Sequence, residues 1–425
     1  MAGVVHVIGA GLAGLSAAVR LADEGRPVVV HEAAGVAGGR CRSYHDPALD
    51  LTIDNGNHLL LSGNWAALDY LARIGAGDAL SRQPGGAVFP FADLATGERW
   101  TLRLSEGRMP WWVLDARRRV PGTQARDYLA PLGILRADPA ATVGEAMTCA
   151  GPLYERLWRP VLLAALNTEP PEAAAGLAAQ LLRETLAAGG HACHPLVARV
   201  GLSAAFVEPA LRHLALKGAW IHFGRRLRAI GFDGDMAGRL DFGETTVALM
   251  PDDAVVLAVP PWIAPDLVPG LEVPTTFRAI VNAHFRVPPP PDTPPVTGLV
   301  GGLSEWLFAF PDRLSVTISG ADRLIGEPRE ALAEAIWREV ATLTGLPPEL
   351  PRWQIVKERR ATFAATPENA AKRPPARTRT RNLVLAGDWT ATGLPATLEG
   401  AVRSGYAAAA VLHETVAAGR VRAAA

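Results

Sequence analysis

Three glycines near the start of the chain have the spacing of a phosphate-binding turn. Gly9, Gly11 and Gly14 follow a short β-branched segment and precede a helical pattern of apolar residues. In a strand–turn–helix unit of this kind, the first glycine permits the turn, the second lets the backbone approach a pyrophosphate, and the third allows the helix to pack closely on the strand. The helix would begin at Leu12 and Ala13, whose N–H groups would face the anion. The pattern predicts a dinucleotide site.

A carboxylate follows at the place where such a unit binds ribose. The segment 28–31 predicts a second parallel strand, and Glu32 closes it. A carboxylate there accepts hydrogen bonds from both ribose hydroxyls, which selects an adenosine ribose without a 2′-phosphate. A solvated strand end would explain Glu32 taken alone, but its position after the glycine turn predicts ribose binding.

A second glycine-rich loop comes directly after Glu32 and contains Gly38, Gly39 and Arg40. Dehydrogenases that bind NAD do not need such a loop. At this point the chain resembles the flavin amine oxidase and phytoene desaturase superfamily, in which a Gly-Gly-Arg loop wraps the FAD pyrophosphate. The resemblance implies FAD as the cofactor.

Two further segments resemble elements of the same superfamily. Asn55, Gly56, Asn57 and His58 resemble the segment that brings backbone near the isoalloxazine, although a structural histidine is an equally good explanation of His58. Val255 lies in an apolar run that resembles the internal strand beside the adenine. The resemblance therefore implies that both segments contact FAD.

A segment near the C-terminus resembles the superfamily most specifically. A buried strand there ends at Gly387 and Asp388, and the resemblance implies that the acid binds the ribityl chain or the pyrophosphate. The following helix would offer the backbone N–H groups of Thr397, Leu398 and Glu399 to flavin N1 and O2. Its N-terminal field would stabilise the negative charge of the reduced flavin. Together with the first glycine turn, this segment predicts tight, noncovalent FAD.

The sequence of residues 387–397, GDWTATGLPAT, narrows the resemblance. It is similar to the squalene-associated FAD-dependent desaturases, understood as hydroxysqualene dehydroxylases of bacterial hopanoid synthesis. Segments 157–168 and 358–367 support this similarity, which spans essentially the whole chain. Where an Arg-Asp-Ser-like triplet is expected, the chain departs from the family and has Arg183, Glu184 and Thr185.

The resemblance implies reductive removal of an allylic hydroxyl. Water leaves to give an allylic cation, and reduced flavin delivers hydride from N5. Such a site needs a proton donor and apolar walls that exclude water. Glu184, Arg183 and Asn167 are candidates because they are polar within otherwise apolar helices, and His58 is a rival nearer the flavin. An ion pair between Arg183 and Glu184, or solvent exposure, is the simpler explanation of the first three.

The elements that position these residues predict an α/β fold. We expect a Rossmann-like FAD-binding domain of the flavin amine oxidase type with an inserted helical and mixed-sheet substrate domain. The FAD-binding domain is expected to comprise three separate segments, at 1–65, 221–265 and 376–425. Between them we expect a mainly helical substrate region at 66–220 and a mixed-sheet substrate region at 266–375.

Composition excludes several other functions. The 425 residues are 49% hydrophobic, and 42 basic residues balance 42 acidic ones, so a nucleic-acid partner is not expected. Three cysteines without a CxxC pair predict neither a disulfide framework nor a metal site. No second glycine fingerprint indicates how electrons reach the flavin, so an external reductase and direct reaction with a nicotinamide both remain open.

The setting predicted for the chain is cytoplasmic. No leader pattern and no apolar run of about 20 residues is evident. The segment from Met109 through Trp111 and Trp112, followed by arginines 117–119, would fit a lipid interface, so peripheral contact with the inner membrane surface is an open alternative. A helix with a solvated charged end is the simpler explanation.

Three alternative functions differ from dehydroxylation. A carotenoid or phytoene-type desaturase would use the flavin to oxidise an isoprenoid hydrocarbon. An amine oxidase is less favoured, because the C-terminal segment offers only Trp389 and Tyr406 for an aromatic cage. A prenyl- or lipid-binding escort of the same fold would not need intact glycine motifs, which this chain has.

Overall fold

The computed structural model describes residues 3–424, with side chains described as far as residue 414. One half of the molecule is built on a five-stranded sheet in which every neighbouring pair is parallel. Its strands, in spatial order, are β10 (Trp220–His222), β2 (Val28–His31), β1 (Val5–Ile8), β14 (Ala254–Leu257) and β20 (Leu383–Leu385). Strands β1, β14 and β20 are fully buried, as their continuous apolar sequences predict.

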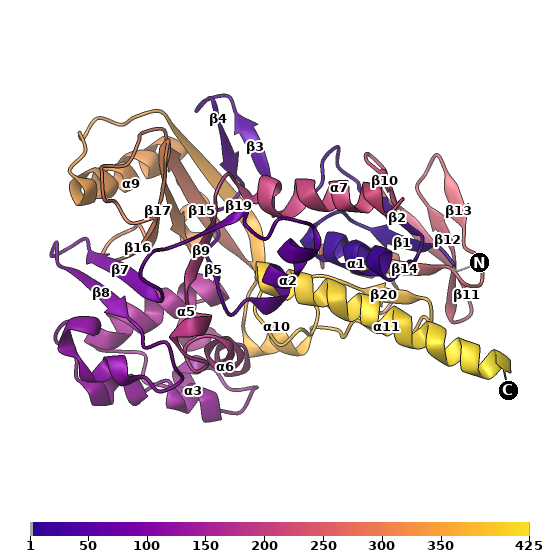
Figure 1. Ribbon diagram of the computed structural model, residues 1–425, viewed down its shortest axis with the longest axis horizontal. Helices are drawn as coiled ribbons and strands as arrows, with labels where there is room; N and C mark the ends of the chain where they lie inside the picture. The colour runs from indigo at the N-terminus through magenta and orange to yellow at the C-terminus, as the bar shows by residue number, and fades with distance from the viewer. Residues whose placement is uncertain (1–2, 425) are drawn as a thin grey trace.

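Two helices cover this sheet, and the N-terminal end of each is predicted to face the FAD. Helix α1 (Leu12–Asp23) follows β1, and the long helix α11 (Leu398–Ala424) lies along it (Figure 1). The two helices approach closely at Gly405, where a Cβ atom would lie 2.1 Å from the Ser16 Oγ atom. Glycine at this position therefore sets the packing of the C-terminal helix on the first one.

The other half contains a seven-stranded mixed sheet, shown at the left of Figure 1. Its spatial order is β19 (Trp353–Phe363), β15 (Phe277–Phe285), β18 (Arg313–Ile318), β17 (Trp306–Phe310), β16 (Val296–Val300), β7 (Val88–Asp93) and β8 (Arg99–Arg103). Only the β16–β7 pair in this sheet is parallel. Helix α9 (Arg329–Thr344) covers one face, where Trp337 packs against Phe285 with ring centroids 5.1 Å apart.

The region expected to be mainly helical is only partly so. It contains helices α2 (Trp65–Arg73), α3 (Leu132–Arg136), α4 (Val143–Ala146), α5 (Arg159–Leu166), α6 (Ala175–Glu184) and α7 (Glu208–Leu216). It also contributes β7 and β8 to the large sheet and the short strands β6 (Leu80–Arg82) and β9 (Pro195–Ala198). These strands were missed because each is short and its pairing partners lie far away in the sequence.

The remaining elements are short. Strands β3 (Ser43–Asp46) and β4 (Leu51–Asp54) form a hairpin, and β5 (Leu60–Leu61) pairs with β9. A small sheet contains β11 (Ala229–Asp233), β12 (Met236–Asp241) and β13 (Thr246–Ala248). Two short α-helices, α8 (Ala264–Leu267) and α10 (Pro367–Ala371), lie between these elements and the C-terminal segment in the sequence. The α/β architecture is as predicted, whereas the five divisions of the chain stay a prediction.

Among the described residues, no helix combines the length and the apolar character that crossing a membrane requires. The same portion of the chain contains no group of three or more His, Cys, Asp or Glu residues arranged to hold a metal ion.

Candidate active site

The first glycine turn has the geometry of a backbone cradle. Gly9 has a φ of 109°, and a Cβ atom there would lie 2.4 Å from the Ala258 carbonyl oxygen. A Cβ atom on Gly14 would lie 1.9 Å from the Gly9 oxygen, whereas one on Gly11 would meet nothing within 4 Å. Gly11 is also the N-cap of α1, without a side-chain cap. The start of α1 is therefore open on the Gly11 side, where an anion would bind.

The second glycine loop lies against the first. Gly38 has a φ of 104°, its N–H donates to the Ala10 oxygen at 2.8 Å, and it forms a bridge with Gly11. A Cβ atom on Gly39 would come within 3.4 Å of the Gly11 Cα atom. The two loops thus meet through backbone alone, as the predicted pyrophosphate site requires.

Glu32 is held beside this cradle by two backbone donors. Its Oε2 atom accepts from the Ala10 N–H and its Oε1 atom from the Ala34 N–H, both at 2.7 Å. Each carboxylate oxygen has a further lone pair, so the orientation is fixed while acceptor capacity for ribose hydroxyls remains. The N–H of Arg225 donates to the Glu32 carbonyl oxygen at 2.8 Å, and sequence reasoning missed this neighbouring segment.

Val255, for which the sequence predicts a contact with adenine, lies inside the parallel sheet. The residue lies in β14 between β1 and β20 and has no exposed surface. Its N–H donates to the Asn382 oxygen at 2.8 Å within the sheet. Both its side chain and its backbone donor are therefore used inside the fold, and the contact of Val255 with adenine stays a prediction.

Arg40 joins the second glycine loop to the C-terminal segment. Its Nη2 atom lies 2.7 Å from both carboxylate oxygens of Asp388, and its Nη1 atom donates to the Ala361 oxygen. The Asp388 side chain is only 10% exposed, but 42% of the Arg40 side chain is. The guanidinium thus keeps an accessible side next to the glycine cradle, which suits an anionic ligand.

Arg373 fixes the loop that carries Asp388, and sequence reasoning missed it. This buried guanidinium donates to the carbonyl oxygens of Asp388 and Thr390 and to the Thr392 Oγ1 atom, and it lies over the Phe363 ring at 4.8 Å. Burial lowers its pKa to about 10, against the opposing charge of Asp388, so it stays protonated at neutral pH. No sequence motif marks this residue.

Helix α11 begins at Leu398, next to the three residues whose N–H groups are predicted to face the flavin, Thr397, Leu398 and Glu399. The Thr397 Oγ1 atom accepts from the Gly400 N–H at 3.0 Å, and as first-turn residues Leu398 and Glu399 have no intrahelical acceptor for their N–H groups. The buried Glu399 carboxylate has a separate role, because it accepts from the N–H groups of Ala66 at 3.1 Å and Ala67 at 2.8 Å. Glu399 thereby caps α2.

The segment Asn55–His58 is tied to the large sheet by residues that sequence reasoning missed. The Asn57 Nδ2 atom donates to the Thr317 Oγ1 atom at 3.1 Å, and Thr317 donates to the Asn282 Oδ1 atom at 2.7 Å. Asn55 Nδ2 lies 3.3 Å from a Glu358 carboxylate oxygen. The available signal was Asn282, a polar residue in the middle of strand β15 with apolar neighbours on either side. Asn57 Oδ1 is buried and has no hydrogen-bond partner within the described structure.

His58 lies near Gly56, where a Cβ atom would be 3.9 Å from the His58 Nε2 atom. Burial, and then the positive charge of Arg40, lower the pKa of His58 to about 4. The imidazole is therefore neutral at pH 7. A neutral imidazole can donate a hydrogen bond, but it is too weak an acid to protonate a hydroxyl group that leaves as water.

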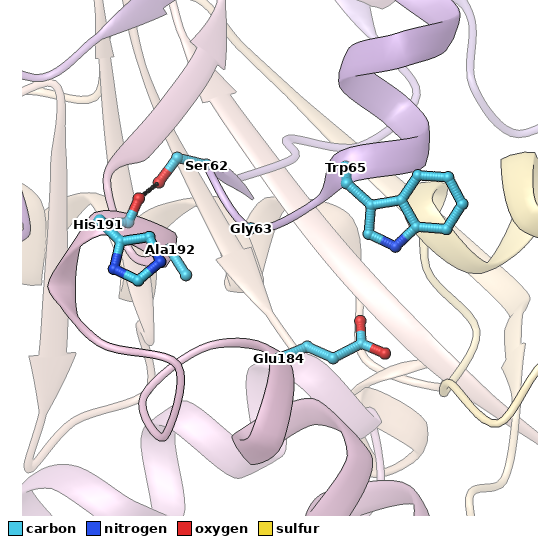
Figure 2. Close-up of a pocket in the computed structure, with 6 residues that line it drawn as sticks. All are labelled: Ser62, Gly63, Trp65, Glu184, His191 and Ala192. Atoms are coloured by element: carbon cyan, nitrogen blue, oxygen red, sulfur yellow. Dashed lines mark hydrogen bonds between the residues drawn. The ribbon is translucent and has the colours of Figure 1, made fainter. Parts of the chain in front are cut away.

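Glu184 faces an open cavity of about 420 Å³ but is ion-paired. Arg403 donates to its two carboxylate oxygens at 2.8 and 2.5 Å, and Gln180 donates at 2.5 Å. Burial by itself would raise the pKa of Glu184, but the bonds from Arg403 and Gln180 outweigh it and hold the pKa below its ordinary value. Figure 2 shows the carboxylate directed toward Trp65, and the cavity is lined by Ser62, Gly63, Trp65, Glu184, His191 and Ala192.

Arg183 and Asn167, the other two residues predicted to be catalytic, do not line the cavity that Glu184 faces. Arg183 is exposed and donates to the Leu135 oxygen at 2.8 Å, not to Glu184. Asn167 is buried at the end of α5, where its Oδ1 atom accepts from the Gly320 N–H at 2.7 Å and its Nδ2 atom donates to Thr362 at 3.0 Å. Asn167 thus joins α5 to the large sheet, a structural task.

Glu305 is an acidic residue that sequence reasoning missed. Its Oε2 atom accepts from the Ser319 N–H at 2.7 Å. Burial raises the pKa of Glu305 to about 7, against the opposing effects of that hydrogen bond and of the Arg159 charge. This carboxyl therefore retains its proton for a substantial share of the time near neutral pH, unlike Glu184.

Comparisons with known proteins agree with this geometry. The sequence model of the family described as flavin containing amine oxidoreductase matches residues 12–413. A hydroxysqualene dehydroxylase of Rhodopseudomonas palustris is 57% identical over 421 residues, which are 99% of this chain and 100% of the relative. A protein of the same name from Sinorhizobium fredii is 56% identical and covers 95% of this chain and 97% of its own length.

Solved structures show the same fold. Cyclohexylamine oxidase from Brevibacterium oxydans superposes with a TM-score of 0.71 at 15% identity, covering 97% of this chain and 99% of that one. Putrescine oxidase bound to putrescine superposes with a TM-score of 0.62 at 16% identity over the same shares of the two chains. At such identities the likeness extends to the fold alone.

Proposed function

Because the chain belongs to the flavin-containing amine oxidoreductases and, among them, to the hydroxysqualene dehydroxylases, we propose that it converts hydroxysqualene to squalene. It is an FAD-dependent oxidoreductase. The observation that carries the proposal is identity of 57% along nearly the whole chain with a relative of that name. In the proposed reaction a proton leaves with the hydroxyl as water, and a hydride takes the place of the hydroxyl on carbon.

The residues of the site fit FAD. The open side of Gly11, the oriented Glu32 carboxylate and the accessible side of Arg40 suit a pyrophosphate flanked by a ribose. Bound and reduced, FAD supplies the hydride from N5. The chain contributes backbone N–H groups at the start of α11, whose positive end favours negative charge on a flavin pyrimidine edge.

The chain must also keep water away from a cationic carbon. On the large sheet, Phe91 stacks on Trp100 at 5.6 Å and meets the edge of Trp306 at 5.8 Å. These rings share one core cluster with Trp158 and Leu162 of the α5 region. We propose that this tightly packed aromatic core borders the path of the hydrocarbon, where it would exclude water.

The proton donor must hold its proton near pH 7. Among the residues predicted from sequence, Glu184 has a lowered pKa and His58 has a pKa of about 4, so neither does so in the ligand-free protein. Glu305, whose pKa is about 7, does. Glu305 does not line the cavity that Glu184 faces, so we propose Glu184 and His58, each gaining a proton when substrate binds, as the donors to test, with Glu305→Gln as the comparison.

Single turnover tests both the reaction and its direction. Photoreduced protein is mixed anaerobically with hydroxysqualene, and flavin absorbance and products are followed; we expect reoxidation and squalene in equal amounts. Reduced flavin whose N5 hydrogen has been exchanged for deuterium should transfer label to squalene. Oxidation of squalene or phytoene by the oxidised protein, with no reaction of hydroxysqualene, would support a desaturase instead. A protein that binds the lipid but holds no flavin would support an escort.

We further propose that the enzyme acts in the cytoplasm at the inner membrane surface, where a triterpene would dissolve. The source of electrons for FAD is a separate partner, either a reductase or a free nicotinamide. Steady-state reduction of the flavin by NADH and NADPH, each with and without a flavin reductase, distinguishes these two sources.

A further inference from the structure

Five large apolar side chains are exposed within one short stretch of the chain. Met109, Trp111, Leu114, Leu129 and Leu132 are 58%, 62%, 65%, 60% and 40% exposed. We call this set the Trp111 patch. Other exposed large apolar residues of the described chain, such as Val200, Leu216 and Met250, are scattered over distant elements. A cluster of this kind on a water-soluble surface marks an interaction site.

The Trp111 patch stands on an ordered base. Trp111 and Leu114 belong to the helical turn Trp111–Leu114, and Leu129 ends the turn Ala125–Leu129. Between these turns, the buried Trp112 meets the edge of Tyr128 at 5.1 Å, and the Tyr128 hydroxyl accepts from the Val120 N–H at 2.8 Å. The inner side chains thus anchor both turns to the core, and the outer apolar side chains are left exposed.

Positive charge surrounds the patch. Residues 103–136 contain six arginines besides Arg103 but only three acidic residues, although the chain as a whole is neutral. In the run Arg117–Arg119, two of the three guanidinium groups bind backbone carbonyl oxygens of the protein itself. Arg118 donates to the Arg103 and Leu104 oxygens at 2.9 and 2.8 Å, and Arg119 donates to the Val113 oxygen at 2.7 Å. The exposed cations near the patch include Arg108, Arg126 and Arg136.

We propose that the Trp111 patch is the surface on which the protein docks to a membrane that contains anionic lipids. The indole and aliphatic side chains would enter the interface, while arginines meet the phosphates of the head groups. A second copy of the chain fits the same face poorly, because a two-fold interface would bring one arginine-rich rim against another. Docking of this kind does not depend on the proposed chemistry, although it would give access to a hydrocarbon dissolved in the membrane.

Vesicle sedimentation tests the proposal. The FAD-loaded protein is mixed with vesicles of phosphatidylcholine alone or with added phosphatidylglycerol, and we expect binding that is stronger with the anionic lipid and weaker in high salt. The variant Trp111→Ser/Leu114→Ser/Leu129→Ser should lose about tenfold or more of the partition coefficient. The matched control, Val200→Ser/Leu216→Ser/Met250→Ser, removes three apolar side chains elsewhere that are even more exposed, and it should bind like the parent.

Charge and self-association are tested separately. The variant Arg108→Ser/Arg126→Ser should lose most of the preference for phosphatidylglycerol while its flavin absorbance stays unchanged. This second variant still tests the proposal if the apolar variant does not fold. Equal vesicle binding by the parent and the folded patch variant would overturn the proposal. The proposal would also be overturned if the parent does not bind vesicles and instead forms a dimer that the patch variant does not form. Turnover of detergent-dispersed hydroxysqualene reports on the proposed function independently, because both forms should catalyse it alike.

Discussion

Arg403 of helix α11 and Glu184 of helix α6 form an ion pair between residues 219 positions apart, with Nη2 and Oε2 separated by 2.5 Å. The same guanidinium donates to Glu399 at 2.7 Å and lies 4.9 Å from the centre of the Trp65 ring. Since Glu399 caps α2, Arg403 connects the helix that begins at the predicted flavin edge with α2 and α6. The pair therefore holds α6 against α11.

Removing the charge of Glu184 should loosen this connection. The ion-pair partners are 22% and 15% exposed, so Glu184→Gln should lower the free energy of unfolding by about 1 to 3 kcal/mol. FAD affinity should change little, because Glu184 does not approach the glycine cradle. Urea denaturation and FAD titration measure the two effects. Glu172→Gln, which weakens the more exposed pair with Arg278, is the control and should cost little.

The kinetics of the same variant separate a structural role from proton donation. A structural Glu184 predicts a loss of stability with a modest change in kcat. Full stability combined with a large fall in kcat would instead support Glu184 as the proton donor.

Glu32→Ala should weaken FAD binding by about 1.5 to 3 kcal/mol, because charge-assisted bonds to the ribose hydroxyls are lost. The carboxylate also orients the Ala10 and Ala34 N–H groups, so Glu32→Gln should recover some of the affinity. Quenching of flavin fluorescence on binding gives both dissociation constants. Glu244→Ala removes an exposed acid outside the cradle and serves as the control. Unchanged affinity in Glu32→Ala would disprove the ribose assignment.

Gly11→Ala and Gly14→Ala should fail in different ways. A methyl group on Gly11 meets nothing in the protein, so stability without FAD should fall by only a few tenths of a kcal/mol. FAD affinity should nevertheless drop steeply, since the methyl group occupies the open side of the cradle. On Gly14 the methyl group would lie 1.9 Å from a carbonyl oxygen, so that variant should lose more than about 3 kcal/mol of stability. Thermal denaturation of apoprotein and FAD titration distinguish the two. If Gly11→Ala binds FAD normally, the pyrophosphate lies elsewhere.

Glu305 should make stability depend on pH. Its pKa is raised from 4.5 to about 7, so the folded protein binds its proton more tightly than the unfolded chain does. The resulting stabilisation is complete below about pH 4.5 and is lost as the pH rises to about 7, a change of up to about 3 kcal/mol. Glu305→Gln should remove this contribution, and Glu334→Gln, at an exposed position of α9, should not.

The comparison needed is the difference in unfolding free energy between variant and parent at pH 5 and at pH 7.5, because other groups titrate in the same range. A difference independent of pH would show that Glu305 titrates normally. If Glu305 is also the proton donor, kcat for Glu305→Gln should fall more than kcat for His58→Ala.

The sequence by itself determined the cofactor site. Gly9, Gly11, Gly14 and Glu32 lie within one continuous strand–helix–strand unit, so their positions relative to one another follow from local backbone geometry. That these residues bind the FAD stays a prediction. The α/β class follows equally from apolar strands whose two faces must both be buried. The family membership rests on motifs of the same local kind.

Tertiary structure decided what depends on distant partners. The sequence paired Glu184 with its neighbour Arg183, but folding brings Arg403 to it instead. Val255 belongs to the correct strand, yet only the order of the strands shows that it is enclosed on both sides. Burial likewise keeps the proton on Glu305 and removes it from His58. Spacing along a chain fixes local geometry, whereas ionisation and exposure depend on neighbours that only the folded chain brings together.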